Sequence, residues 1–267
     1  MNTRIEQRFD WLKSRRKKGF IAYITAGDPT LKATVDIVLR LEDAGVDIVE
    51  LGIPFSDPLA DGRVNQQAAT RALANGTTLD GVLDCVVEIR KKSDIPILFY
   101  SYLNLLIARG FENTIRRVAG AGTDGLLILD LPVEEAAQQE KTLARHHLNN
   151  ICLVAPTSPD ERIRRIVRAS TGFVYCVSRE GVTGMQKELS PAAVSLIKKT
   201  KRLTKLPVAL GFGISSPEQA QTAAREADAV VVGSAIVDHF ASEPHTSRGR
   251  AKAAAWVKTL VQAVGRA

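Results

Sequence analysis

The sequence contains little cysteine and no long hydrophobic run, and both absences narrow the kind of protein it can be. Its three cysteines, Cys85, Cys152 and Cys176, form no C-x-x-C or Cys/His spacing. An odd number of cysteines, scattered along the chain, argues against a disulfide framework and a zinc site, so we expect reduced thiols and no metal. There is no stretch of about 18 apolar residues, and the first residues lack an apolar signal core. We therefore expect no membrane span, no secretion and a cytoplasmic location.

The charge balance also lacks a strong bias toward one sign. Lys and Arg number 36 against 29 Asp and Glu, which leaves a formal net charge of +7 at pH 7. This favours anionic ligands, but nucleic-acid-binding proteins usually concentrate more basic charge on one face. The basic runs at 15–18 and 162–168 lie in helical patterns without interleaved aromatic residues, which is typical of a solvated helix face. We expect no nucleic acid partner.

Eight short apolar runs, rich in β-branched residues, recur along the chain, each followed by a segment with helical periodicity. Strands this apolar, separated by helices, are typical of an α/β protein whose parallel sheet is buried on both faces. Eight such units without a linker favour a single-domain (β/α)8 TIM barrel over residues 1–267, rather than two doubly wound domains. The expected strands are 20–25, 48–51, 97–100, 126–129, 151–154, 173–177, 207–210 and 229–232.

Two segments fall outside this repeat. One is an extra N-terminal helix, roughly Ile5 to Arg16, and the other is an unusually long connection from Gly52 to about Asn75. Barrel active sites lie on the loops after the carboxyl ends of the strands, so the long connection is expected to be functional. Three later helices are predicted to begin with a capping Ser followed by Pro at the first helical position, at Ser158-Pro159, Ser190-Pro191 and Ser216-Pro217.

The second expected strand carries a carboxylate among apolar residues. Alternation of side chains along the strand points Glu50 into the barrel. A buried carboxylate is costly unless it is paired or its titration is useful, so Glu50 is either held by a Lys or backbone amides, or catalytic. Asp57 and Asp61 follow in the next loop, where Asp is also an ordinary turn residue. Two carboxylates in different environments of one apolar mouth can separate an acid role from a base role.

Glycine-bearing turns follow the last three expected strands, at Gly181 to Gly184, Gly211 to Ser215 and Gly233-Ser234. Barrel phosphate sites are commonly built there, from exposed amides and the N-terminus of a short helix. The pattern predicts a phosphate ester as ligand. Tyr175, Tyr23 and Tyr100 share inward-facing strand positions, where aromatic residues are either core or ligand contacts.

Four motifs resemble the alpha subunit family of tryptophan synthase. They are ELGIPFSDPLADG at 50–62, SREGVTG at 178–184, GFGISSPEQA at 211–220 and VVGSAIV at 231–237. Their order and spacing match that family over nearly the whole chain. The resemblance implies a TIM barrel that cleaves indole-3-glycerol phosphate by a retro-aldol reaction, without a metal or organic cofactor of its own.

The resemblance also implies residue roles. Glu50 and Asp61 fall on the catalytic carboxylates, with Tyr175 beside them. Glu50 is expected to move protons at the reacting carbon and hydroxyl, while Asp61 accepts the indole N–H. Substrate and phosphate contacts are expected at Tyr23, Tyr100, Leu127, Thr183, Gly184, Phe212, Gly213, Gly233 and Ser234.

The sequence departs from the family pattern beside Asp61. The family usually continues with Pro, a variable residue, an aliphatic residue and Gln, whereas this chain has Arg63, Val64, Asn65 and Gln66. These changes affect loop stiffness and one apolar indole contact. Leu129 stands where the family often has a smaller residue, which would tighten the indole pocket.

A partner is expected at the long connection. The resemblance implies a beta subunit that contains pyridoxal phosphate, in an α2β2 assembly, and places Pro54, Phe55 and Asp57 at the contact. Apolar residues on a loop rim are stabilised by docking on another protein, and Asp57 could pair with a cation there. The alternative is a self-contained lid over the substrate.

Two other functions remain open. Another phosphate-handling barrel, such as a sugar-phosphate isomerase, would share the glycine turns without needing Asp61. A non-catalytic regulatory subunit would keep the fold and serve only to activate its partner.

Overall fold

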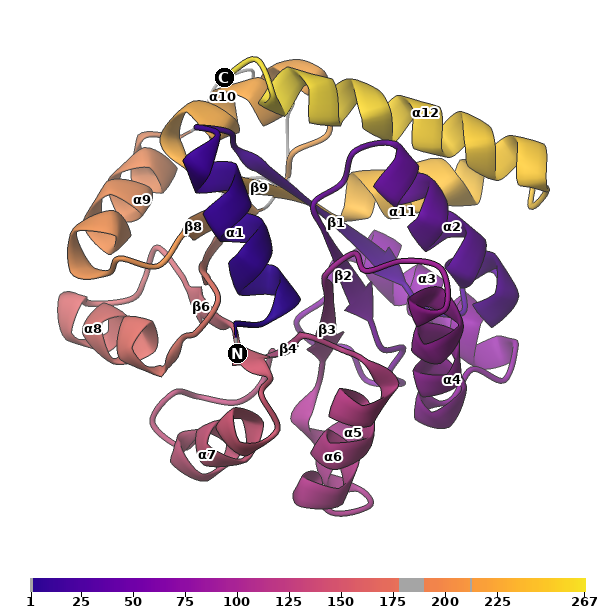
Figure 1. The fold of residues 1–267 in the computed structure, drawn as a ribbon, viewed down its shortest axis with the longest axis horizontal. Helices are drawn as coiled ribbons and strands as arrows, with labels where there is room; N and C mark the ends of the chain where they lie inside the picture. The colour runs from indigo at the N-terminus through magenta and orange to yellow at the C-terminus, as the bar shows by residue number, and fades with distance from the viewer. Residues whose placement is uncertain (1, 178–189, 212) are drawn as a thin grey trace.

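The strands of the computed structural model run parallel to one another and form a barrel (Figure 1). The structure describes residues 2–177, 190–211 and 213–267. Within these residues the strands are β1 (Gly19–Thr25), β2 (Ile48–Gly52), β3 (Ile97–Ser101), β4 (Gly125–Ile128), β5 (Asn149–Asn150), β6 (Cys152–Val154), β7 (Val174–Val177), β8 (Val208–Gly211) and β9 (Ala229–Val232).

The order of the strands in the sheet is β5-β4-β3-β2-β1-β9-β8-β7-β6. The short strands β5 and β6 occupy one position in the barrel, because only Ile151 separates them and its N–H donates to the carbonyl of Leu126. The sheet therefore closes through this position, and the expected TIM barrel is confirmed. The expected fifth strand began too late, since Asn149 and Asn150 are polar residues that give no strand signal. Asn149 is nevertheless buried, with its amide bonded to Thr3 and Glu6 at the N-terminus.

Side chains alternate along the strands between two apolar layers. The outer layer packs between the sheet and the surrounding helices, and the inner layer fills the barrel. In β1, for example, Phe20 and Ala22 belong to the outer layer, whereas Ile21 belongs to the inner one. This double burial explains why the strands read as continuous apolar runs rather than as alternating ones.

Helices surround the barrel (Figure 1), and half of the described ones begin at a capping side chain. Ser190 and Ser216 cap their helices with Pro in the first turn, as predicted. The third Ser-Pro prediction was one residue early, because Pro159 is the N-cap and the Ser158 hydroxyl accepts from the N–H of Ala155 instead. The described helices are α1 (Arg4–Ser14), α2 (Leu31–Asp43), α3 (Arg63–Ala74), α4 (Leu79–Arg90), α5 (Leu103–Ile107), α6 (Phe111–Ala121), α7 (Ala137–Arg145), α8 (Asp160–Ala169), α9 (Pro191–Leu203), α10 (Pro217–Glu226), α11 (Ser234–Ser242) and α12 (Ser247–Val264).

The N-terminal helix α1 lies across one end of the barrel (Figure 1). Thr3 and Glu6 form a capping box at its start. Its buried side chains Ile5, Phe9 and Leu12 join the inner layer, where the ring of Phe9 lies 5.5 Å from that of Phe173. The extra helix thus closes the amino-terminal end of the barrel and leaves the opposite end open for a site.

We had expected one long loop after β2, from Gly52 to about Asn75, but only the first part of this connection is a loop. Residues 53–62 are irregular, and the helix α3 follows them directly. Its buried face consists of the small side chains Ala68, Ala69 and Ala72, which give only a weak apolar stripe in the sequence. The functional loop is therefore about ten residues, and its end is anchored by a helix.

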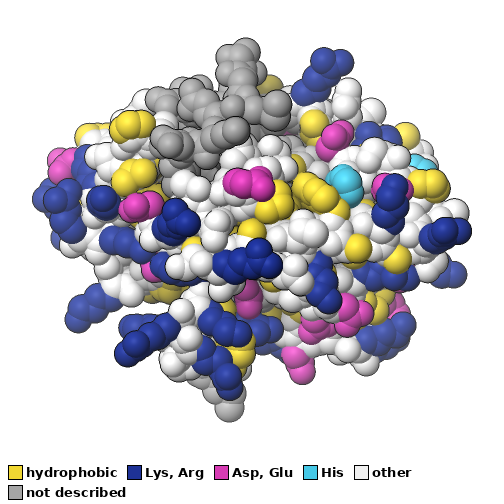
Figure 2. Space-filling view, turned by 90° about the horizontal axis from the view of Figure 1, so that it is seen from above, with side chains coloured by type: hydrophobic (Ala, Val, Ile, Leu, Met, Phe, Trp, Pro, Cys, Tyr) yellow, Lys and Arg dark blue, Asp and Glu magenta, His cyan; other side chains and the backbone are white. Residues whose placement is uncertain are grey.

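Charged side chains are distributed over the surface rather than gathered by sign. Figure 2 shows Lys and Arg spread over one face with Asp and Glu among them. Among the described helices, none is both long and apolar enough to cross a membrane.

Candidate active site

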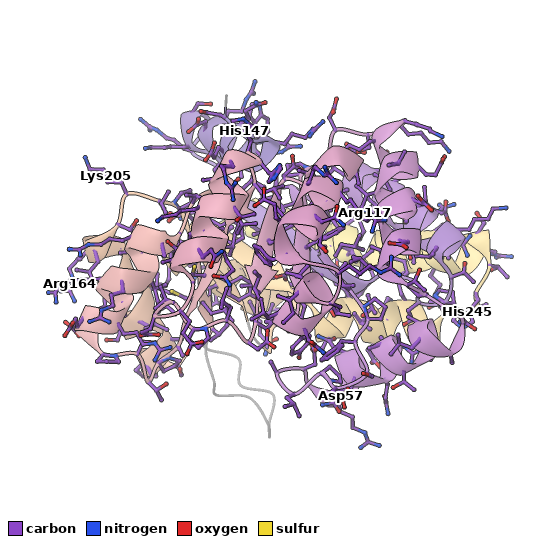
Figure 3. The ribbon with its side chains drawn as sticks, turned by 90° about the horizontal axis from the view of Figure 1, so that it is seen from below. Asp57, Arg117, His147, Arg164, Lys205 and His245 are labelled. Atoms are coloured by element: carbon purple, nitrogen blue, oxygen red, sulfur yellow. The ribbon has the colours of Figure 1, made fainter. Side chains whose placement is uncertain are left out.

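A cavity of about 340 Å³ lies at the carboxyl end of the barrel. It combines inward strand residues with residues of the loops that follow the strands, and apolar side chains form much of its wall. In Figure 3, Asp57 on the loop after β2 and His147 near the amino-terminal end lie at opposite edges of the molecule. A wider groove of about 800 Å³ runs beside α1 at that other end, away from the strand carboxyl ends. The residues lining the smaller cavity include Tyr23, Glu50, Asn65, Tyr100, Leu127, Leu129, Leu153, Tyr175, Val177, Gly213, Val231, Gly233 and Ser234.

Glu50 enters the cavity from the middle of β2, on the inward face that alternation predicted. Its side chain is 1% exposed, and among the described residues its Oε1 has no hydrogen-bond partner. Burial, together with the negative charge of Asp61, raises the pKa of Glu50 to about 8. A carboxyl group that titrates near neutrality can both give and take a proton, which suits it to acid and base catalysis.

Asp61 lies on the loop between β2 and α3, in a different environment. The hydroxyl of Tyr100 donates to its Oδ1 at 3.0 Å, and the hydroxyl of Tyr102 donates to its Oδ2 at 2.9 Å. Partial burial raises the pKa of Asp61, while these donors act in the opposite direction because they stabilise the ionised form. One carboxyl group is buried, with an oxygen that no described residue donates to, and the other is held by two hydroxyls, so the pair can divide acid and base roles.

Three tyrosines, Tyr23, Tyr100 and Tyr175, belong to the cavity wall. The rings of Tyr23 and Tyr100 meet edge to face, with centroids 4.9 Å apart. Burial raises the pKa of Tyr175, and the nearby charge of Glu50 adds to the shift, so its hydroxyl stays protonated and can donate. Gly52 and Gly211 make room for these rings, because a Cβ at either position would overlap the hydroxyl of Tyr23 or Tyr175.

The glycine turns that the sequence singled out lie on the same cavity where the structure describes them. Gly213 has a positive φ of 71°, a conformation that glycine adopts readily, and a Cβ there would meet open space. Gly233 is the N-cap of α11 and offers no capping side chain, and both Gly233 and Ser234, the first residue of the helix, line the cavity. Thr183, Gly184 and Phe212 lie outside the described residues.

The loop after β2 has an exposed edge. Asp57 is exposed, Leu59 is 93% exposed, and Phe55 is half-buried against the ring of Tyr102. Pro54 is buried and offers no surface of its own in this chain. The expected partner contact therefore has an exposed acidic and apolar rim, with Leu59 as a member that the sequence analysis did not name.

Comparison with known proteins decides the family. The family model of the tryptophan synthase alpha chain matches residues 9–264. The chain belongs to the tryptophan synthase alpha chain family. This membership makes it a lyase of tryptophan biosynthesis, and the resemblance seen in the four sequence motifs is confirmed.

Individual family members agree along almost the full length. The chain is 47% identical to the tryptophan synthase alpha chain of Opitutus terrae, over 88% of this chain and 89% of that one. It is 48% identical to that of Caldanaerobacter subterraneus subsp. tengcongensis, over 89% and 90%. The crystal structure of tryptophan synthase subunit alpha from Legionella pneumophila str. Paris superimposes with a TM-score of 0.91 at 34% identity and covers 100% of both chains.

The tryptophan synthase of Mycobacterium tuberculosis, solved in space group F222, is also similar. Its chain gives a TM-score of 0.89 at 33% identity, with 99% of each chain covered. At this identity the likeness extends beyond the fold to the family.

Tyr102 is a site residue that the sequence analysis missed. It follows Tyr100 at the spacing of two that keeps side chains on one face of a strand, and this signal could have identified it. Asn65 was noted only as a departure from the family, yet it lines the cavity and its Nδ2 lies 3.5 Å from Oδ1 of Asp61. In the described part of the chain, no group of three or more His, Cys, Asp or Glu is placed to hold a metal ion.

Proposed function

We propose that this chain cleaves indole-3-glycerol phosphate to indole and glyceraldehyde 3-phosphate by a retro-aldol reaction. The observation that carries the proposal is the pair of carboxyl groups at one cavity. Glu50 lies inside the barrel with a pKa raised to about 8, and Asp61 lies at the mouth, held by two tyrosine hydroxyls. The family membership supports the same reaction.

The reaction needs three events that this pair can supply. Ring carbon C3 takes up a proton, the side-chain hydroxyl next to it loses one, and the ring nitrogen carries positive charge in between. As the hydroxyl electrons form the aldehyde C=O, the bond from C3 to the side chain breaks and its electrons return to the ring. A carboxyl group that gives one proton and takes up another is regenerated at the end, so no other reactant is required.

Glu50 fits the proton-transfer role because it is buried and titrates near neutrality. Asp61 fits the role of acceptor for the ring N–H, since an ionised carboxylate there stabilises the cationic ring electrostatically. Tyr175 lies close enough to Glu50 for the charge of Glu50 to raise the pKa of the tyrosine, and the Tyr175 hydroxyl would donate to the substrate. Leu127 and Tyr23 would contact the ring from the wall of the cavity.

The phosphate would bind away from the two carboxyl groups, to backbone amides near Gly213, Gly233 and Ser234. The uncapped N-terminus of α11 supports this, because its amides and dipole favour an anion. Thr183, Gly184 and Phe212 complete the proposed phosphate and substrate contacts.

The partner would be a tryptophan synthase beta subunit, in an α2β2 assembly in the cytoplasm. We propose that pyridoxal phosphate belongs to that partner and that this chain needs no cofactor of its own. Asp57, Phe55 and Leu59 on the exposed rim support a contact there, and Pro54 would shape the rim from beneath.

One assay separates this function from its rivals. The purified chain is given indole-3-glycerol phosphate and indole release is measured, for the wild type, Glu50→Gln, Asp61→Asn and the exposed control Glu88→Gln. We expect release by the wild type and the control, and a loss of about 10²- to 10⁴-fold in the two site variants, since each keeps its size but loses its titrating group.

The alternatives give different results. A sugar-phosphate isomerase or a purely regulatory subunit would release no indole in any form. If Glu50→Gln kept most of the wild-type turnover, the assignment of Glu50 would be wrong.

A further inference from the structure

Arg71 anchors α3, the helix that follows Asp61 directly. Its guanidinium forms a forked pair with the carboxylate of Asp28, with Nε at 3.0 Å from Oδ1 and Nη2 at 2.7 Å from Oδ2. Asp28 lies on the loop after β1, and its side chain is only 9% exposed. The side-chain amide of Asn75, at the end of the same helix, donates to the carbonyl of Pro29 at 2.7 Å. Two parallel hydrogen bonds between ionised groups fix direction as well as distance, so the Arg71–Asp28 pair holds α3 in one place relative to the barrel.

The apolar packing of α3 is weak by comparison. Its buried face consists of Ala68, Ala69 and Ala72, each of which buries a single methyl group. Ala68 joins a small cluster with Tyr23 of β1 and Val237 of α11. Because a methyl group makes few contacts, the polar anchors at the end of the helix contribute much of what fixes its position.

The beginning of α3 holds Asp61. The side-chain amide of Gln66 donates to the backbone carbonyl of Asp61 at 2.9 Å, and the N-cap Gly62 is its neighbour in the chain. The carboxylate of Asp61 is bonded instead to Tyr100 and Tyr102, at the end of β3. Asp61 therefore joins two elements, with its backbone fixed to α3 and its side chain fixed to the end of β3. A shift of α3 would strain the two tyrosine hydrogen bonds, which weaken as they lengthen and bend.

Arg71 has a second charged neighbour, but the pair with Asp28 dominates. The hydrogen bonds to Asp28 raise the pKa of Arg71, and the more distant charge of Asp238 on α11 adds to the shift. Asp238 is exposed, so water screens its attraction. Arg71 lies outside the described cavity wall, about 12 Å along the helix from its first residue. It can therefore act on the reaction only through the position of α3.

We propose that Arg71, through its pair with Asp28, positions Asp61 for the cleavage step. This inference rests on the proposed function, because it concerns the alignment of a carboxylate that the proposed reaction uses. Arg71 is a positioning residue and not a catalytic one. A displacement of about 1 Å at a reacting group can cost as much as 10²-fold in rate, so a remote anchor of this kind has a measurable effect.

The test compares Arg71→Gln, Arg71→Lys and Asp28→Asn with the wild type, each as the full chain. Gln keeps a polar side chain but removes the charge and the fork, whereas Lys keeps the charge and loses the fork. The matched control is Arg117→Gln. Arg117 pairs with Asp80 at 2.7 Å and connects α6 to α4, outside the described cavity wall. Its side chain is 35% exposed, against 39% for Arg71.

Indole release from indole-3-glycerol phosphate is measured as a function of pH. We expect kcat to fall by about ten- to a hundred-fold in Arg71→Gln and in Asp28→Asn, with little change in KM. Arg71→Lys should keep part of the lost activity. The double variant of Arg71→Gln with Asp28→Asn should lose no more than either single variant, since both remove the same pair. Arg117→Gln should behave as the wild type.

The pH profile separates positioning from a loss of stability alone. Weaker tyrosine hydrogen bonds would raise the pKa of Asp61, so the acid limb of kcat/KM should move to higher pH in the Arg71 and Asp28 variants. The basic limb, expected from Glu50, should not move, because Asp61 is ionised at that pH. Carbon NMR of the carboxyl groups, assigned with Asp61→Asn, measures the pKa of Asp61 without turnover. If Arg71→Gln does not fold, Arg71→Lys serves for the same comparison.

Other outcomes overturn the proposal. An unchanged kcat and acid limb in all the Arg71 and Asp28 variants would limit the pair to fold stability and leave the proposed reaction intact. An equal loss in Arg117→Gln would mean that any broken ion pair has this effect. A higher KM at constant kcat would assign Arg71 to substrate binding instead. A wild type that releases no indole would overturn the proposed function and this inference together.

Discussion

The hydroxyl of Tyr102 donates a hydrogen bond of 2.9 Å to Oδ2 of Asp61, although the two residues are 41 positions apart. The same hydroxyl accepts the N–H of Ala60 at 2.9 Å, so it binds the loop backbone as well as the carboxylate. The ring of Phe55 packs on Tyr102 with centroids 5.1 Å apart. A residue of the exposed rim therefore touches the residue that positions a proposed catalytic carboxylate, which gives a physical route from a docked partner to the cavity.

Removing either tyrosine hydroxyl should disturb Asp61 without removing it. Tyr102→Phe and Tyr100→Phe each lose one donor, and we expect kcat to fall by about ten- to a hundred-fold in each, as for a hydrogen bond to a charged group. These donors lower the pKa of Asp61, so their loss should move the acid limb of the kcat/KM profile to higher pH. Tyr23→Phe is the comparison, because the Tyr23 hydroxyl pairs with the hydroxyl of Thr25 rather than with the carboxylate of Asp61. An acid limb that stayed in place in both variants would exclude the positioning role.

Glu50 should make the stability of the protein depend on pH. Its folded-state pKa is raised from 4.5 to about 8, so the folded state holds the proton more tightly than the unfolded state does. Between these values the free energy of unfolding therefore falls as the pH rises, and the loss is complete above the folded pKa. Relative to the wild type, Glu50→Gln should gain up to about 4 kcal/mol between pH 4.5 and pH 9.

Urea unfolding of both proteins across this pH range measures that gain. The exposed control Glu88→Gln should show a constant difference from the wild type. A constant difference for Glu50→Gln as well would mean that Glu50 ionises in the folded state as readily as in water.

The phosphate site can be tested at a glycine. Gly213→Val would place a side chain at the cavity, where it should block the approach of backbone to anion and raise KM more than it lowers kcat. Gly76→Val is the matched control, since Gly76 has a similar positive φ of 74° and an open surrounding but does not line the cavity. Steady-state kinetics with both variants separates backbone strain from anion binding. A similar rise of KM in the two would refute the phosphate assignment.

The exposed rim should govern stimulation by the beta subunit. We expect the isolated chain to be weakly active, to be stimulated markedly by a beta subunit, and to lose most of that stimulation in Asp57→Ala with little change in basal rate. Asp10→Ala is the control, because Asp10 is exposed on α1 at the other end of the barrel. Indole production is measured with and without beta subunit. Equal stimulation of wild type and Asp57→Ala would remove Asp57 from the contact.

Much of the architecture and part of the site can be predicted from local sequence patterns. Strands buried on both faces appear as apolar runs, and helices appear as stripes with caps, because each signal depends only on near neighbours in the chain. The same local rule of alternation places Glu50 inside the barrel. The glycine turns are predicted to lie at the carboxyl end of the barrel because they follow the last strands in the sequence. Local signals failed where polar or small residues are buried by distant partners, as at Asn149 and in the alanine face of α3.

The electrostatics of the site were decided only by the tertiary structure. Whether Glu50 is paired or free depends on which groups the closed barrel brings near it, and its pKa follows from that burial. Tyr100 and Tyr102 reach Asp61 across 39 and 41 residues, a distance over which no periodic pattern carries information. Sequence determines which residues alternate and which helices begin where, whereas the chemistry of a buried group depends on neighbours that only folding assembles.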